Sequence, residues 1–180
     1  MYIAQKLKKE NVIEYLLYMW QIEDILRAFN FDMEAVTREI ITPQKLSVEN
    51  EKLLCGWYDS LIEMMISEGI KERGHLQINK NTLDELTELH RKELSGKDAS
   101  YTAKYYHVLP YIAQLRQRQN DSQESDIEVS LNFLYGILLL RLQKKEISKE
   151  TMNAKDEITK FMILLAHKYN QYKRGELEEE

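Results

Sequence analysis

Residues 12–29 read VIEYLLYMWQIEDILRAF, and this stretch decides the fold class. Apolar side chains fall on nearly every face of the helix that it would form, because the polar ones are few. A helix that is apolar almost all round is buried at the centre of a protein. We therefore predict a central helix here, with an arm over residues 1–10 before it. Asn11 stands three residues before Glu14, which is the spacing of a capping box that starts such a helix.

Outward from this segment, helical spacing recurs along the whole chain, and strand-like alternation is nearly absent. The pattern predicts seven helices, at residues 4–29, 33–41, 48–73, 82–94, 99–118, 127–145 and 149–173. Helices joined by short connections are typical of an antiparallel bundle or a compact helical array. We therefore expect an all-α fold in a single domain of residues 1–180, with a frayed acidic tail over 175–180.

Two of these helices show where the core contacts should lie. In the helix over 48–73, the apolar positions that follow the helical period are Leu54, Trp57, Leu61 and Met65. In the last helix they are Ile158, Phe161, Met162, Leu165 and Tyr169. Each set marks a buried stripe. Asn81 is expected to cap the helix over 82–94, and Gly96 to end it in the left-handed conformation.

Composition limits the class of protein. The single cysteine, Cys55, cannot form an intrachain disulfide, and no signal segment is visible at the N-terminus. The longest apolar run, residues 133–140, is far shorter than the ~20 residues that a membrane-spanning helix needs. We therefore expect a cytoplasmic protein with no membrane partner.

Charge argues against a nucleic-acid partner. The net charge is −5, whereas nucleic-acid binding depends on clustered Lys and Arg side chains that neutralise phosphates. Residues 104–118 do interleave aromatic and basic side chains, including Lys104, Tyr106 and Arg116, in the manner of a base-stacking platform. However, Tyr105 falls on the apolar stripe of the predicted helix, and the cations are few, so we expect no nucleic-acid binding.

Common catalytic and metal-binding motifs are missing from the sequence. A di-iron bundle needs two Glu-x-x-His motifs, and the chain has one, from Glu72 to His75. A helical nucleotide pyrophosphohydrolase needs paired acidic motifs that converge on magnesium, and Glu85 with Glu88 supplies only the first. We therefore predict no catalytic residue, no metal and no cofactor, and we favour a protein that is not an enzyme.

Polar side chains on the central helix are the most unusual feature. With a histidine from a later leucine stripe, they form a candidate polar cluster of Glu14, Gln21, Glu23, Asp24, Arg27 and His90. Glu23 and Arg27 are four residues apart and can pair on one helix face. Two interpretations stay open: these residues form the one exposed strip of a buried helix, or they face a cleft or a partner subunit. His90 can likewise be a hydrogen-bonded core histidine, or a ligand or base.

The opening of the chain carries a family resemblance. Residues 1–7 (MYIAQKL), Asn11 and residues 14–28 (EYLLYMWQIEDILRA) resemble the start of an uncharacterised all-helical bacterial family that is catalogued as a domain of unknown function. The resemblance implies a soluble bacterial protein of similar length and agrees with the helical fold. It implies no activity, cofactor or catalytic residue.

Two classes of function follow. The first is a non-enzymatic interaction or scaffold protein, which forms a homodimer or docks on another protein. The all-helical plan and the 11 tyrosines favour it, because Tyr and Trp are enriched in the cores of interfaces. The second is a small-molecule-binding protein or enzyme with a polar site inside the bundle, near the central helix. The two differ in whether the polar residues converge in a concave pocket.

Overall fold

The computed structural model describes residues 1–96, 98–118 and 123–176, and within them it contains eight α-helices and no strand. The helices are α1 (Tyr2–Glu10), α2 (Val12–Ala28), α3 (Met33–Val36), α4 (Val48–Ser67), α5 (Gln77–Ser95), α6 (Ala99–Arg118), α7 (Asp126–Leu142) and α8 (Lys149–Lys173). The all-α prediction with about seven helices is confirmed. Within the described ranges, no helix is both long enough and apolar enough to span a bilayer.

The first predicted helix is two helices that meet at Asn11. This residue has an extended backbone, and its side chain accepts hydrogen bonds from the amides of Ile13 (3.1 Å) and Glu14 (3.3 Å). The amide group of Asn11 also donates to the Glu14 carboxylate at 3.2 Å. Asn11 therefore starts α2 as predicted, while the expected arm over residues 1–10 is the separate helix α1.

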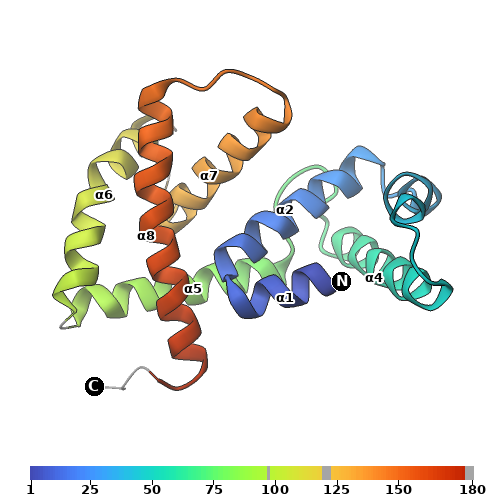
Figure 1. Ribbon diagram of the computed structural model, residues 1–180, viewed down its shortest axis with the longest axis horizontal. Coiled ribbons are helices and arrows are strands. Elements are labelled where there is room, and N and C mark those ends of the chain that lie inside the picture. Colours follow the sequence, from blue (N-terminus) through green and yellow to red (C-terminus); the bar gives the residue numbers. More distant parts are fainter. Residues whose placement is uncertain (97, 119–122, 177–180) are drawn as a thin grey trace.

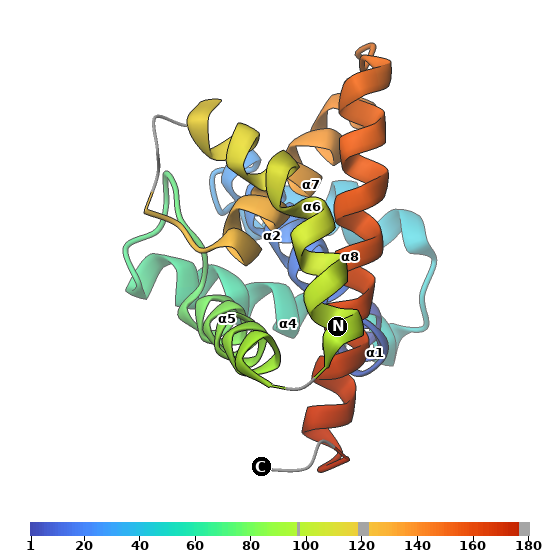
Figure 2. The same cartoon turned by 90° about the vertical axis from the view of Figure 1, so that its left-hand side faces the viewer.

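Two helices, α2 and α8, organise the core. Figure 1 shows α8 running the height of the molecule, and it contacts α2, α5, α6 and α7. Figure 2 shows the same helix lying beside α6. The predicted stripe of α8 is buried throughout. In α2 the buried residues are Val12, Ile13, Tyr15, Leu16, Met19, Trp20, Ile22, Glu23 and Leu26. The prediction of a central, nearly all-apolar helix is confirmed.

The connection between α4 and α5 differs from the prediction. Helix α4 ends at Ser67, and α5 begins at Gln77, so Asn81 lies inside α5 rather than capping it. Carboxylates from elsewhere in the fold stabilise the start of α5: Glu68 accepts the Gln77 amide at 2.7 Å, and Glu23 accepts the Leu76 amide at 3.1 Å. These contacts are tertiary, so the helical periodicity did not reveal them.

Smaller differences occur at other helix ends. Gly96 has φ −80°, which is not the left-handed conformation that we predicted. Residues 37–44 leave the α-helical path through a π-helical turn (Thr37–Ile41) and a 3-10 turn (Thr42–Gln44). Of the predicted acidic tail, Gly175 and Glu176 are described, and Glu176 pairs with Arg174. Residues 177–180 lie outside the described residues.

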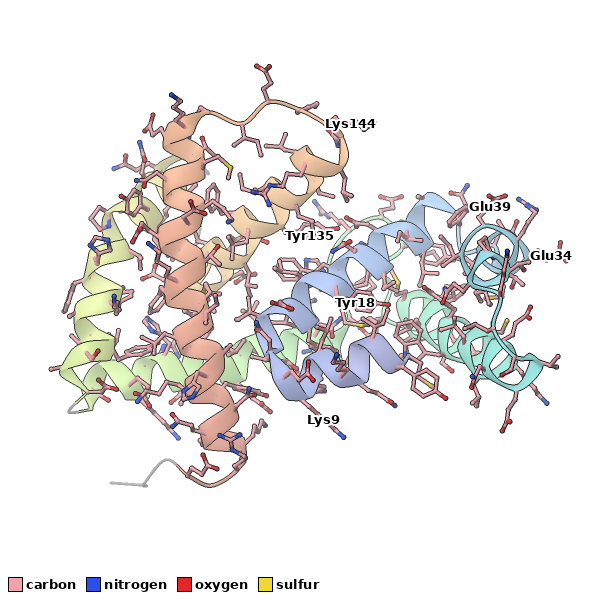
Figure 3. The ribbon with its side chains drawn as sticks, viewed as in Figure 1. Lys9, Tyr18, Glu34, Glu39, Tyr135 and Lys144 are labelled. Atoms are coloured by element: carbon pink, nitrogen blue, oxygen red, sulfur yellow. The ribbon has the colours of Figure 1, made fainter. Side chains whose placement is uncertain are left out.

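Helix α4 lies at the edge of the molecule, together with α3 and away from α6 and α8 (Figure 1). Its inward face is buried at Tyr58, Leu61, Ile62 and Met65. Burial raises the pKa of the Tyr58 hydroxyl to about 12, and the neighbouring Tyr18 of α2 adds to this shift. Tyr18 is labelled on α2 in Figure 3. Helix α4 therefore packs on the fold mainly through the face that carries these buried residues.

Candidate functional site

The structure divides the candidate polar cluster among several places. Glu23, Asp24 and Arg27 lie in one network, whereas Glu14 and His90 lie elsewhere. Among the described residues, Gln21 makes a single long hydrogen bond of 3.5 Å, to the Leu17 carbonyl of its own helix. The six residues therefore do not converge on one point.

Glu23 is the centre of the network. Its residue surface is 0% exposed, and a buried carboxylate needs hydrogen-bond donors to offset its lost hydration. One oxygen, Oε2, lies 2.6 Å from Nδ1 of His75. The other, Oε1, accepts from the Leu76 amide at 3.1 Å and from Nδ2 of Asn79 at 2.7 Å. Asn79 in turn accepts the Tyr15 hydroxyl at 3.1 Å, so the network returns to α2.

Aromatic rings cover one side of this network. Trp20 stacks on His75 with their ring centroids 4.1 Å apart, and Tyr135 of α7 meets Trp20 edge-on at 5.6 Å. The Tyr135 hydroxyl, labelled in Figure 3, donates to Oδ2 of Asp24 at 2.6 Å. Burial, followed by the adjacent Asp24 carboxylate, raises the pKa of Tyr135, so the phenol keeps its proton and remains a donor.

Arg27 connects the network to the segment that precedes α5. Its guanidinium pairs with Asp24 at 2.8 Å and donates to the carbonyl of Ile70 through Nε (3.3 Å) and Nη2 (3.2 Å). Nη2 also donates to the carbonyl of Gly74. The expected pair between Glu23 and Arg27 is wrong, because Glu23 is occupied by the donors at the start of α5. The guanidinium of Arg27 instead binds two backbone carbonyls of the connection between α4 and α5.

The hydrogen bonds of Glu23, Asp24 and Arg27 connect α2 to α7 and to residues 68–79. The carboxylate oxygens of Glu23 and Asp24 and the guanidinium of Arg27 all have protein partners. Satisfied buried networks of this kind rigidify a fold and specify its arrangement. In the described part of the chain, no three or more His, Cys, Asp or Glu side chains are placed to hold a metal ion.

His90 lies in a different part of the core, between α5, α6 and α8. Its Nδ1 is 2.8 Å from the Tyr101 hydroxyl, and its ring packs edge-on against Tyr105 and Phe161. Burial lowers the pKa of His90 to about 4, while Asp126 opposes this shift. The side chain is therefore neutral at neutral pH. This environment favours the interpretation of His90 as a hydrogen-bonded core residue.

Glu14 lines a cleft in the described part of the chain. A cleft of about 180 Å³ lies between α2, α7 and α8. Its walls are mainly apolar, and the residues are Asn11, Ile13, Glu14, Leu17, Leu134, Ile137, Leu138, Arg141, Lys155, Thr159, Met162 and Ile163. Arg141 donates to the sulfur of Met152 at 3.8 Å. Within the described residues, no carboxylate lies at ion-pair distance from it.

The outward face of α4 is a feature that the sequence reasoning missed. Leu53 is 45% exposed, Met64 is 36% exposed, Trp57 is partly exposed, and Ser60 is exposed. They follow one another at spacings of four, three and four residues, so they share one side of the helix. We call this set the α4 stripe. Trp57, which was predicted on the buried stripe of this helix, does pack against the core, but it is also partly exposed and lies between Leu53 and Ser60.

Comparison with known proteins identifies the family of this chain. No curated protein and no solved structure matches the chain. The model of a protein family described as a domain of unknown function (DUF4924) matches residues 1–176. That agrees with the resemblance found at the opening of the sequence. The chain, an all-helical protein with a cross-linked polar core and an exposed α4 stripe, thus belongs to the DUF4924 family of unknown function.

Proposed function

We propose that this protein is a non-enzymatic helical interaction module that docks on a protein partner through the α4 stripe. The observation that carries the proposal is the stripe itself: Leu53, Ser60 and Met64 are exposed, Trp57 is partly exposed, and the four form an uncharged row at coiled-coil spacing. Covering such apolar surface stabilises an assembly by roughly 25 cal/mol for each Å² removed from water. Exposed apolar side chains that share one side of a helix are a feature of interaction surfaces.

The exposed apolar surface extends beyond α4. The hydroxyl of Tyr2 donates to Asn50 of α4 at 3.4 Å, which places the start of α1 beside the first turn of α4. Tyr2 and its neighbour Ile3 are both exposed. Large apolar side chains therefore continue from α4 onto α1. A partner helix lying on the α4 stripe would reach them at one end.

The polar network supports this role because it fixes how α4 is presented. Arg27 holds the carbonyls of Ile70 and Gly74, which lie just after the end of α4. Glu23 holds the start of α5 on the other side of the same connection. A surface held in one orientation before binding loses less conformational entropy when its partner arrives. Glu23 and Arg27 therefore have a structural role, which is to hold α4 in one orientation.

Site-specific photo-crosslinking in the cells of origin tests the proposal. A benzophenone amino acid is placed at Leu53 in one variant and at Ile66 in another. Ile66 is a matched control, because it is 43% exposed on the opposite side of the same helix. We expect a discrete crosslinked protein species from position 53 and none from position 66. Equal crosslinking from both positions, or none from either, would contradict the proposal.

A second candidate function is the binding of a small aliphatic carboxylate in the cleft between α2, α7 and α8. The observation in its favour is the position of Arg141, which lines the cleft together with apolar residues such as Leu138 and Met162. In the described chain, no carboxylate lies at ion-pair distance from this cation. The volume of about 180 Å³ lies below the usual range of ~300–1,000 Å³, so only a small ligand fits.

Native mass spectrometry tests this second candidate. Octanoate is added to the wild-type chain and to the Arg141→Gln variant. If the cleft binds carboxylates, the wild type retains one octanoate and the variant loses most of it. Equal retention by both proteins, or none by the wild type, would exclude the cleft as a site for this ligand class.

A further inference from the structure

We infer that the partner of the α4 stripe is a second copy of this chain, docked antiparallel so that Lys52 of each copy pairs with Glu63 of the other. This inference rests on the proposed function and names its partner. The observation behind it is the distribution of charged side chains along α4, all of whose residues the structure describes. That helix contains one cation, Lys52, and four acidic residues, Glu49, Glu51, Asp59 and Glu63.

Lys52 and Glu63 lie on the same flank of the α4 stripe. At about 100° of rotation per residue, the two side chains fall within about 20° of each other and about 90° from Leu53. Both are exposed. Within the described residues, neither has an opposite charge at ion-pair distance, so both charges are free to meet a partner. Gly56 lies between them on this flank and has no side chain to block the approach.

Antiparallel docking brings these opposite charges together. A twofold axis perpendicular to two antiparallel helices places like flanks side by side, and each contact occurs twice. When Trp57 faces the partner's Ser60, Leu53 faces the partner's Met64, and Lys52 lies next to the partner's Glu63. The large side chain of Trp57 then meets the small side chain of Ser60 at the centre of the contact. A pair of Leu53 and Met64 lies on either side of this centre.

Parallel docking in register would not form these pairs. A twofold axis that runs along two parallel helices brings opposite flanks together, so the flank with Lys52 and Glu63 would lie away from the same flank of the partner. Paired opposite charges across an interface favour the arrangement that forms them. Lys52 and Glu63 therefore favour the antiparallel pair, and a second copy of the same helix supplies both halves of this pair.

The size of the contact sets the expected affinity. A helix of 20 residues is about 30 Å long, so one helix pair gives an interface at or below the usual lower limit of ~1,200 Å². Tyr2 and Ile3 add exposed apolar area at one end of α4. We therefore expect a reversible dimer with a dissociation constant in the micromolar range, rather than an obligate one.

Charge exchange followed by sedimentation equilibrium tests the inference on the full chain. The proteins are the wild type, Lys52→Glu, Glu63→Lys, the double variant Lys52→Glu/Glu63→Lys, and Lys104→Glu as the control. Lys104 is an exposed cation on α6, at the other side of the molecule from α4. Circular dichroism shows that each variant keeps its helical content.

We expect each single variant to weaken dimerisation by roughly tenfold, because an attraction becomes a repulsion at two symmetric positions. The double variant restores the affinity to within about threefold of wild type, and Lys104→Glu leaves it unchanged. Restoration in the double variant isolates the Lys52–Glu63 coupling from other effects of either change.

Two results would overturn the inference. The first is a wild type that stays monomeric up to about 200 μM, which is well above the micromolar dissociation constant expected for an interface of this size. The second is a double variant that dimerises more weakly than either single variant. Photo-crosslinking at Leu53 separates this failure from that of the proposed function. A monomeric chain that crosslinks to another protein at position 53 keeps the α4 stripe as a docking surface and excludes the second copy. A monomeric chain without crosslinks contradicts both.

Discussion

The carboxylate of Glu23 and the imidazole of His75 lie 2.6 Å apart, although 52 residues separate them in the chain. Glu23 is fully buried, whereas the His75 side chain is 30% exposed and stacks on Trp20. The contact therefore joins the middle of α2 to the connection that follows α4. Together with the bonds from Arg27 to the carbonyls of Ile70 and Gly74, it links the core helix to the part of the fold that carries the α4 stripe.

Removal of this carboxylate should be costly. The change Glu23→Ala leaves the Leu76 amide and the Asn79 side chain without their buried acceptor, and each such loss costs ~1–3 kcal/mol. We expect the free energy of unfolding to fall by about 3 kcal/mol or more in urea titrations. Glu146→Ala, at an exposed loop position, is the control and should change it by less than ~0.5 kcal/mol. Similar values for both variants would show that the network does not stabilise the fold.

The hydrogen bond between Tyr135 and Asp24 should contribute less. The change Tyr135→Phe keeps the edge-on contact with Trp20 and removes only the hydroxyl that donates to Asp24. A hydrogen bond to a charged group contributes about 1.5–3 kcal/mol, and the partial exposure of Asp24 lowers that value, so we expect a loss of about 1 kcal/mol. Tyr106→Phe is the matched control at an exposed position on α6. Thermal unfolding of both variants beside the wild type checks the difference.

His90 should make stability depend on pH. Burial holds its folded-state pKa at about 4, whereas the unfolded value is about 6.5. Between these values the unfolded chain binds a proton that the folded chain does not, so stability falls as the pH drops from about 6.5 to about 4. The full effect is about 3 kcal/mol, at ~1.4 kcal/mol for each pH unit.

The variant His90→Gln removes this titration. Wild type and variant are unfolded in urea at several pH values between 7 and 4. The stability difference between them should move in favour of the variant by up to about 3 kcal/mol as the pH falls. A difference that stays constant over this range would mean that His90 titrates normally in the folded protein.

The sequence predicted the parts of the fold that depend on local pattern. The apolar residues of 12–29 identified the central helix, and Asn11 marked its first turn. The stripe of the last helix, from Ile158 to Tyr169, is buried as predicted. These features follow from helical periodicity and from capping chemistry, both of which act between residues that are close in the chain.

The candidate site could be predicted only in part, because its contacts are tertiary. The spacing of Glu23 and Arg27 indicated a pair on one helix face, but each side chain found its partners in the 68–79 segment or in Asp24. Nothing in the local pattern showed that Glu23 would lie beside His75. The α4 stripe was readable, since Leu53 and Met64 repeat at helical spacing, but the sequence does not show which of two adjacent stripes the fold covers.

Sedimentation equilibrium of Leu53→Glu beside Ile66→Glu tests the central claim most directly. Both changes place a carboxylate at a partly exposed position of α4, but only Leu53 lies on the α4 stripe. We predict that Ile66→Glu associates like the wild type, whereas Leu53→Glu sediments as a single chain of 21.5 kDa at every concentration. If the wild type associates and Leu53→Glu associates as strongly, the α4 stripe is not the surface through which copies of this protein assemble.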